Sequence, residues 1–287
     1  MKNIKYFFQF LGIIFLILIN YILGLKYSLK LSSSIFLFLG PLFKSKNISE
    51  NNLIKAFPQK SEKERKKIIN EMWINYGKIF AEYIFIKKFR KSEKFSKKIY
   101  IKNQEVLDQI KIDNEPVIFI SGHFNNFELM AMHIEKSGID LAVVYRPLNN
   151  KFLNPLMEKI RRKYICKKQI KKGISGTKEL LSYFKNGSSI ALMIDQRVSE
   201  GSQINFFNEK AYTTTIPAQF VKKFNAKVVP IYINRNQNNN FELEIYNPLE
   251  FKKEDTIENI TLHLNKILED MIIKNPSQWI WTHNRWK

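Results

Sequence analysis

Cysteine is almost absent from this 287-residue chain, which contains only Cys166. A single cysteine excludes an internal disulfide bond and a zinc site built from several thiolates, and it suits a reducing compartment. The sequence also lacks an H-E-x-x-H motif, a G-x-S-x-G elbow, a G-x-G-x-x-G loop and a P-loop. We therefore expect neither a metal centre nor a serine nucleophile, and no bound organic cofactor.

Acidic residues are scarce, because 26 aspartates and glutamates stand against 47 lysines and arginines, for a net charge of +21. Such an excess favours an anionic partner, namely nucleic acid, acidic lipid headgroups or a phosphorylated substrate. No recognised nucleic-acid-binding motif accompanies the charge. The 45% hydrophobic content indicates a folded chain. We therefore expect anionic membrane lipid as a partner, and no nucleic acid.

No charged residue occurs between Tyr6 and Leu25. This run of about 20 residues is long enough to cross the ~30 Å hydrocarbon layer as a helix. A cleaved signal peptide is the alternative, but residues 25–27 (LKY) offer no small-x-small cleavage site. We predict an uncleaved membrane anchor within residues 1–45 and a second domain over residues 46–287.

The lysines around this anchor predict its orientation. Lys2 and Lys5 precede it, whereas more lysines follow it: Lys26, Lys30, Lys44 and Lys46. The positive-inside tendency then keeps the bulk of the chain in the cytoplasm, on the inner membrane. A shorter apolar stretch over residues 35–43 is broken by Gly40-Pro41 and is too short to span. It fits either an interfacial extension of the anchor or a buried helix.

The rest of the chain alternates between short apolar runs and helical patterns. The apolar runs predict strands at residues 116–121, 141–145, 189–194 and 227–233, with 241–246 as the hairpin partner of the last. Helical spacing appears over residues 49–88, 125–137, 154–164, 177–185, 216–224 and 256–273. This alternation predicts an α/β fold in which helices flank a central, largely parallel sheet.

Residues 121–130, SGHFNNFELM, place a histidine and a glutamate just after the first predicted strand. His123 then lies in the turn at the carboxyl end of that strand, the usual place of a site in an α/β sheet, and Glu128 lies in the first turn of the helix. A neutral imidazole accepts a proton from a hydroxyl, and a carboxylate on its other nitrogen stabilises the imidazolium. The spacing alone also fits an ordinary strand-to-helix turn.

Several segments in a fixed order resemble the bacterial lipid A late acyltransferases, the lauroyl and myristoyl transferases of the lysophospholipid acyltransferase superfamily. The apolar first helix and SGHFNNFE are followed by further matching blocks: VVYRPLNN (143–150), IRRKY (160–164), ALMIDQ (191–196), residues 205–235 and PSQWIWTHNRWK (276–287). The likeness covers nearly the whole chain. It implies an acyltransferase-type sandwich with a membrane-anchoring first helix.

The resemblance assigns roles around the histidine. It implies His123 as the general base and Glu128 as its orienting carboxylate, in the family's H-x4-D/E motif. Arg161, or the adjacent Arg162, matches an arginine that the family needs downstream of this motif. Asn125 and Phe127 depart from the family's more frequent glycine and tryptophan, which leaves the base and the carboxylate in place but puts the exact acceptor in doubt.

Two further residues are candidates for binding the acceptor. Arg146 follows a predicted strand directly, where we expect it to hold a phosphate or a sugar carboxylate. Asp195 resembles the family's aspartate in the D-Q/H block, which implies that it binds the acceptor or orients a basic residue. The three terminal tryptophans fit core and membrane-interface packing better than a ligand site: Trp279, Trp281 and Trp286.

The implied reaction moves a fatty acyl chain from acyl carrier protein to a hydroxyl of a Kdo-modified lipid A precursor. The implied partners are therefore acyl carrier protein, the lipid A precursor and anionic lipid. Two alternatives stay open. One is acylation of another glycolipid or of a lysophospholipid, and the other is a basic, membrane-tethered binding protein with an inactive site.

Overall fold

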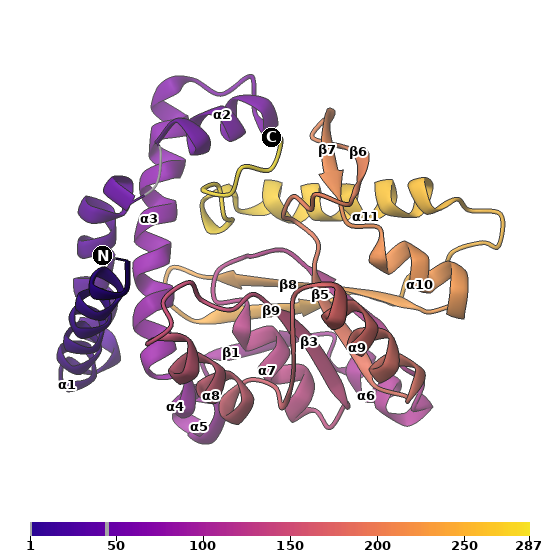
Figure 1. The fold of residues 1–287 in the computed structure, drawn as a ribbon, viewed down its shortest axis with the longest axis horizontal. Helices are drawn as coiled ribbons and strands as arrows, with labels where there is room; N and C mark the ends of the chain where they lie inside the picture. Colours follow the sequence, from indigo (N-terminus) through magenta and orange to yellow (C-terminus); the bar gives the residue numbers. More distant parts are fainter. Residues whose placement is uncertain (1, 44–45) are drawn as a thin grey trace.

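The computed structural model describes residues 2–43 and 46–287, so that Lys44 and the predicted domain boundary after residue 45 lie outside the described residues. Within the described part, seven strands form one sheet in the order β1-β9-β8-β2-β5-β3-β4 (Figure 1). They are β1 (Ile99–Lys102), β2 (Ile118–Ser121), β3 (Leu141–Tyr145), β4 (Lys168–Lys171), β5 (Ser189–Met193), β8 (Val228–Arg235) and β9 (Phe241–Ile245). A separate antiparallel hairpin joins β6 (Ser202–Phe206) to β7 (Glu209–Thr213).

The centre of the sheet is parallel, as the alternation of elements predicts. Strand β2 pairs in parallel with β5 and β8, and all four of its residues are buried. A strand covered on both faces reads as a continuous apolar run, which is why IFIS was visible in the sequence. Among the strand pairs of the described residues in this sheet, β8 and β9 are the antiparallel pair, so β9 and its parallel partner β1 run opposite to the other five strands. The predicted α/β fold class is therefore confirmed.

Helices cover both faces of the sheet, with α11 along one side and α6 and α7 along the other (Figure 1). The helices that follow α1 are α2 (Lys46–Ala56), α3 (Glu62–Ile84), α4 (Ile86–Lys91), α5 (Glu93–Ser96), α6 (Gln104–Asp113), α7 (Glu128–Lys136), α8 (Asn154–Tyr164), α9 (Ile174–Lys185), α10 (Ile216–Phe224) and α11 (Ile257–Lys274), with the 3-10 turn η1 (Pro276–Gln278). The helical pattern over residues 49–88 is divided among α2, α3 and α4. The first of these helices ends at Ala56, two residues before Pro58. The next begins after Ser61, which caps α3 through a capping box.

The apolar amino-terminal helix α1 (Lys2–Phe43) is sharply bent at Gly24, whose φ of 71° and ψ of 166° only glycine adopts readily. The helix is long and apolar enough to cross a membrane, over Asn3–Leu42. The bend divides α1 into a first arm before Gly24 and a second arm after it. The short apolar stretch at 35–43 forms the end of the second arm. Phe36 packs there against Phe80 of α3, with ring centroids 5.7 Å apart, while Phe38 is 76% exposed.

A buried ion pair joins α3 to the central sheet. Arg235 at the end of β8 donates to both carboxylate oxygens of Glu82, from Nε at 3.0 Å and from Nη2 at 2.6 Å. The two side chains are only 3% and 2% exposed. Asn126, in the loop after β2, donates to the same carboxylate at 3.3 Å. The pair thereby connects the helix, the sheet and the loop that carries His123.

Removal of the arginine should strongly destabilise the fold. We expect Arg235→Met to lower the free energy of unfolding by about 3–5 kcal/mol, because Glu82 would keep a buried charge without its partner. Chemical unfolding in detergent, followed by circular dichroism, measures this loss. The double variant Glu82→Leu/Arg235→Met should recover part of it, since neither charge then remains. Glu62→Gln, which breaks an exposed pair with Lys66 on the same helix, should leave the unfolding midpoint unchanged. Equal midpoints for Arg235→Met and the wild type would contradict the expectation.

Candidate active site

The loop between β2 and α7 carries His123 to the carboxyl edge of the sheet. Strand β2 ends at Ser121, and Gly122 follows at a point where an added Cβ would lie 3.2 Å from the carboxylate of Asp195. Asn125 takes a left-handed conformation, with φ of 48°, and its backbone N–H donates to the carbonyl of Gln278. Glycine at 122 and asparagine at 125 therefore suit a tight turn that approaches a neighbouring strand closely.

His123 pairs with Asp195, which lies two residues past the end of the neighbouring strand β5. The Nδ1 atom of His123 lies 2.7 Å from Oδ1 of Asp195, and the backbone N–H of His123 donates to Oδ2 at 2.6 Å. The indole N–H of Trp279 donates to the same Oδ2 at 2.8 Å. The Asp195 side chain is fully buried, whereas the His123 side chain is 21% exposed. This geometry fixes Nδ1 as the nitrogen that faces the carboxylate and leaves Nε2 without a hydrogen-bond partner among the described residues.

The Asp195 carboxylate is stabilised in its ionised form. Burial acts to raise its pKa, but the charge of His123 and the hydrogen bonds from His123 and Trp279 outweigh burial and hold the pKa below the ordinary value of 3.8. A carboxylate that stays ionised is what a histidine base needs, since it stabilises the imidazolium formed when the ring accepts a proton.

Glu128 does not contact the imidazole, which corrects the expectation that it orients His123. It begins α7 and instead accepts from Arg161 of α8, with Nε at 2.8 Å and Nη2 at 2.7 Å from Oε1. Both side chains are nearly buried, at 11% and 14% exposed. The backbone turn over residues 123–127 directs the glutamate toward α8, where the guanidinium compensates its charge. Phe127, the preceding residue, contacts the His123 ring with centroids 4.8 Å apart, so the two pairs are neighbours.

The other residues predicted for the site differ in their exposure and in their contacts. Arg146, just after β3, and Arg162 of α8 are exposed, and neither makes an ion pair with a residue that the structure describes. Arg161 lies near the ring of Tyr145, with its guanidinium carbon 5.7 Å from the ring centroid. Asp195 was expected either to bind the acceptor or to orient a basic residue. Its carboxylate contacts His123 and is closed to solvent, which favours the second role.

Three residues of the site escaped the sequence reasoning. Trp279 was expected to pack in the core, which it does, yet it also donates to Asp195. His283 accepts from the backbone N–H of Arg197 at 3.0 Å, and burial lowers its pKa to about 4, so it is neutral. Tyr83 of α3 has a buried hydroxyl, and burial together with the charge of Glu128 raises its pKa. The terminal PSQWIWTHNRWK block was the one available signal for the first two.

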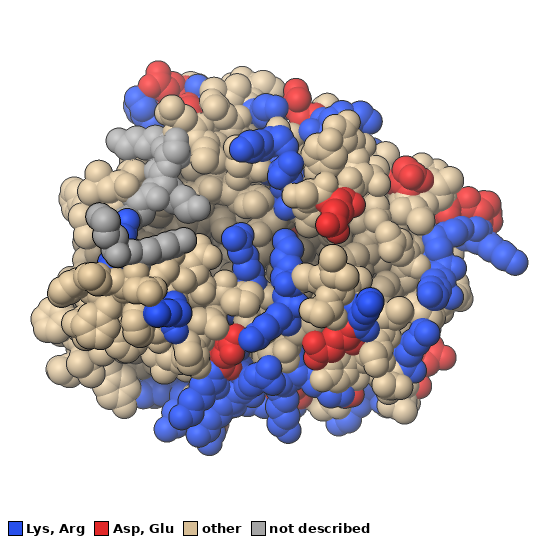
Figure 2. All heavy atoms as spheres, in the orientation of Figure 1, with Lys and Arg blue, Asp and Glu red and all other residues tan. Residues whose placement is uncertain are grey.

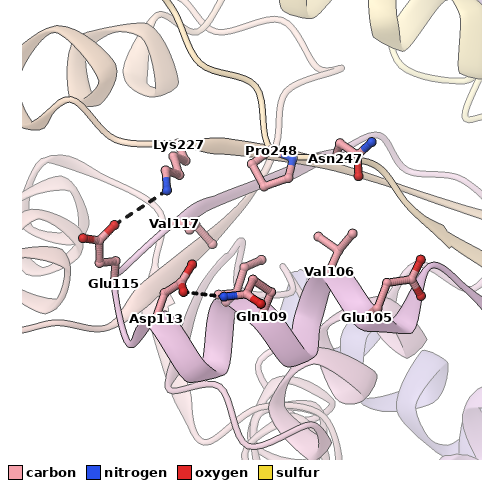
Figure 3. A pocket seen from close by; sticks show the side chains of 10 residues that line it. Glu105, Val106, Gln109, Asp113, Glu115, Val117, Lys227, Asn247 and Pro248 are labelled. Atoms are coloured by element: carbon pink, nitrogen blue, oxygen red, sulfur yellow. Dashed lines mark hydrogen bonds and ion pairs between the residues drawn. The ribbon is translucent and has the colours of Figure 1, made fainter.

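A separate cavity of about 320 Å³ lies at the opposite edge of the sheet from His123. It lies between α6 and the segments that lead into β2 and β8 (Figure 3). Glu115 pairs with Lys227 at its rim, and Gln109 donates to Asp113. These four polar side chains thus satisfy one another, and none of the predicted site residues lines the cavity.

Comparison with known proteins identifies the group to which the chain is similar. The family model for bacterial lipid A biosynthesis acyltransferases matches residues 1–287. The lipid A biosynthesis myristoyltransferase of Escherichia coli K12 is 24% identical over 235 residues, which cover 80% of this chain and 71% of that protein. The lipid A biosynthesis acyltransferase of Haemophilus influenzae is 21% identical over 283 residues, or 96% and 86% of the two chains. The solved structure of the 1-acyl-sn-glycerophosphate acyltransferase PlsC from Thermotoga maritima has a TM-score of 0.41 and 13% identity over 96% of this chain and 99% of that one.

Stability should depend on pH through Asp195. Its pKa in the folded chain lies below that of an unfolded aspartate, about 3.9, so the ionised group contributes stability above about pH 4 that is lost as the pH falls through the folded pKa. The difference in free energy of unfolding between wild type and Asp195→Asn should thus be largest above about pH 5 and shrink below about pH 4. Trp279→Phe, which keeps the carboxylate but removes one donor, should show an intermediate dependence in urea titrations at several pH values. Parallel pH curves for wild type and Asp195→Asn would contradict this assignment.

Proposed function

Because the chain belongs to the bacterial lipid A biosynthesis acyltransferase family, we propose that it transfers a fatty acyl chain from acyl carrier protein to a hydroxyl of a Kdo-modified lipid A precursor. Acyl transfer onto lipid A follows from the family. The carrier-bound donor, the Kdo-modified acceptor and the residue roles are the proposed part. The observation that carries the mechanism is the partly exposed imidazole of His123, which is bonded through Nδ1 to buried Asp195 while Nε2 has no hydrogen-bond partner within residues 2–43 and 46–287.

In the proposed reaction, Nε2 of His123 takes the proton of the acceptor hydroxyl while the oxygen attacks the thioester carbonyl carbon. The Asp195 carboxylate holds the ring in the required tautomer and stabilises the imidazolium. The carbon–sulfur bond then breaks, an ester forms, and the imidazolium returns its proton to the carrier thiolate. A serine or cysteine acyl-enzyme is not required.

In this proposal Arg161 stabilises the negative charge that develops on the thioester oxygen during the attack. Its Nε and Nη2 are directed to Glu128, which leaves further guanidinium donors for an oxyanion or for the acceptor. Glu128 in turn holds the arginine and its charge in the low-dielectric edge of the sheet. We propose Glu128 as a positioning residue for Arg161, and the exposed Arg146 and Arg162 as acceptor-binding cations.

An acidic carrier protein has a cationic surface available at the end of α7 and the starts of β3 and β4, the edge of the sheet opposite His123. Figure 2 shows lysine and arginine side chains gathered along the lower edge of the molecule, where Figure 1 places α4, α5 and α8. A groove of about 610 Å³ there is lined by Arg90, Lys91, Lys136, Lys167 and Lys168, together with Glu135 and Asp140. Arg90 donates to the carbonyl of Ile165 at 3.3 Å, so the groove adjoins the end of α8, the helix that carries Arg161.

The catalytic proposal is tested with purified protein, acyl carrier protein thioesters and the Kdo-modified tetra-acylated precursor, by the mass gained on the acceptor. One added acyl chain is expected. His123→Ala and Asp195→Asn should each lower kcat by about 10²- to 10⁴-fold, because the general base is lost or misoriented. Arg161→Ala should lower kcat to a similar degree through the loss of charge stabilisation, by about 10²- to 10³-fold. The matched control His133→Gln, on α7 but bonded to Gln104, should keep full activity.

Each other outcome of this assay has a meaning. Full activity in His123→Ala would overturn the mechanism. Acylation of only a different glycolipid or lysophospholipid would replace the acceptor. Acceptor binding without any transfer would favour the inactive binding protein.

We expect charge reversal in the cationic groove to weaken binding of the carrier protein without changing the chemical step. Lys91, Lys136 and Lys167 are exposed, and the triple change to glutamate should raise KM for the acyl carrier protein at least about tenfold, with little change in kcat, since charge complementarity acts mainly on association. Transfer from a short pantetheine thioester should be unaffected. The same charge reversal at the exposed Lys63, Lys66 and Lys67 of α3 serves as the control. Equal effects of the two triple variants would contradict a specific groove.

A further inference from the structure

The first arm of α1 is packed against the catalytic domain at both of its ends. Near its start, the backbone carbonyl of Tyr6 accepts from the Asn150 side chain at 2.8 Å, and the rings of Phe7 and Phe152 lie 5.6 Å apart. Near its end, Tyr21 stacks on Phe85 at 6.0 Å. The helix rises about 1.5 Å per residue, so these contacts are about 22 Å apart along its axis.

Such contacts conflict with a helix that crosses the membrane. A spanning helix carries its two ends to opposite sides of a hydrocarbon layer about 30 Å thick. The domain that contains Asn150 and Phe85 lies on one side only. Both Tyr6 and Tyr21 can touch that domain only if the arm between them runs along it.

The bend at Gly24 turns the second arm back on the first. In a straight helix Asn20 and Ser32 would be about 18 Å apart, yet the Ser32 hydroxyl donates to the Asn20 side chain at 2.9 Å. Ser28 donates to the Asn20 backbone carbonyl. These three side chains are 0–1% exposed, so the polar groups at the bend satisfy one another away from lipid. The second arm then packs on α3, where Ser33 reaches the carbonyl of Ile74.

The face of the first arm that points away from the domain is wholly apolar. Its exposed side chains recur every three or four residues, which places them on one side of the helix. They are Ile4, Phe8, Leu11, Phe15, Leu18 and Ile22, with exposed fractions of 45–83%. The left margin of the molecule in Figure 2, where Figure 1 places α1, accordingly carries few charges. Lys26 and Lys30, just past the bend, are exposed and can reach anionic headgroups.

We propose that α1 is a bent platform embedded in one leaflet, with the apolar stripe facing the acyl chains and the amino terminus on the same side of the membrane as the catalytic domain. Asn150 ends the VVYRPLNN block and Phe152 lies two residues further on, so the platform contacts the loop that begins at Arg146, at the carboxyl end of β3. A lipid acceptor would then reach His123 from the leaflet in which the platform lies.

Sidedness of labelling tests the proposal without any need for activity. In a Cys166→Ala background, Asn3→Cys at the start of α1 and Lys210→Cys in the catalytic domain are treated with a membrane-impermeant maleimide, in inside-out and right-side-out vesicles. Both cysteines should label in the same vesicle preparation and be protected in the other. Labelling of the two positions from opposite sides would overturn the proposal, and detergent solubilisation, which should expose both, controls for reactivity.

Immersion depth gives a second, independent readout. Spin labels at Phe8→Cys, Phe15→Cys and Ile22→Cys replace exposed side chains, so the fold should tolerate them. Accessibility to oxygen and to an aqueous nickel chelate should place all three labels within one leaflet. A depth maximum at residue 15, with residues 8 and 22 near opposite headgroup layers, would show a crossing helix and refute the platform. Since neither measurement uses substrate, the result is separate from the outcome of the acyl transfer assay.

Discussion

The buried carboxylate of Asp195 is the group on which the architecture of the site depends. It lies at 0% exposure and receives N–H donors from three directions: the His123 ring, the His123 backbone and the Trp279 indole. A charge in that position is tolerable only while all donors are in place. The carboxylate therefore couples the loop after β2, the end of β5 and the segment after α11 into one unit.

The other buried carboxylates at this edge are compensated in the same manner. Glu128 is paired with Arg161, and Glu82 with Arg235. Asn126 joins the last pair to the loop of His123, while Asn125 of that loop is held by Gln278. The loop is thus fixed from both sides, by α3 and by η1. Such preorganisation means that the donors need not be rearranged when charge develops in the reaction.

The sequence predicted the central strands because each is a continuous apolar run, but the edge strands β1 (IYIK) and β4 (KQIK) are too polar and short to stand out. The contacts within the candidate site differ from those that the sequence suggested. Local spacing suggested that Glu128 would reach His123, whereas the partner is Asp195, 72 positions away. That pairing depends on β2 lying beside β5, a neighbourhood that no local pattern contains. For the same reason Trp279 was predicted as packing, and its bond to Asp195 was not.

The dependence of Asp195 on Trp279 has a consequence for biosynthesis. When a growing chain has left the ribosome only as far as Asp195, it already contains His123, Glu128 and Arg161, but not the indole donor or the η1 segment that holds the loop. A chain at that stage cannot complete the contacts around Asp195. The loop of His123 therefore reaches its final arrangement only once residues 276–279, close to the end of the chain, have docked.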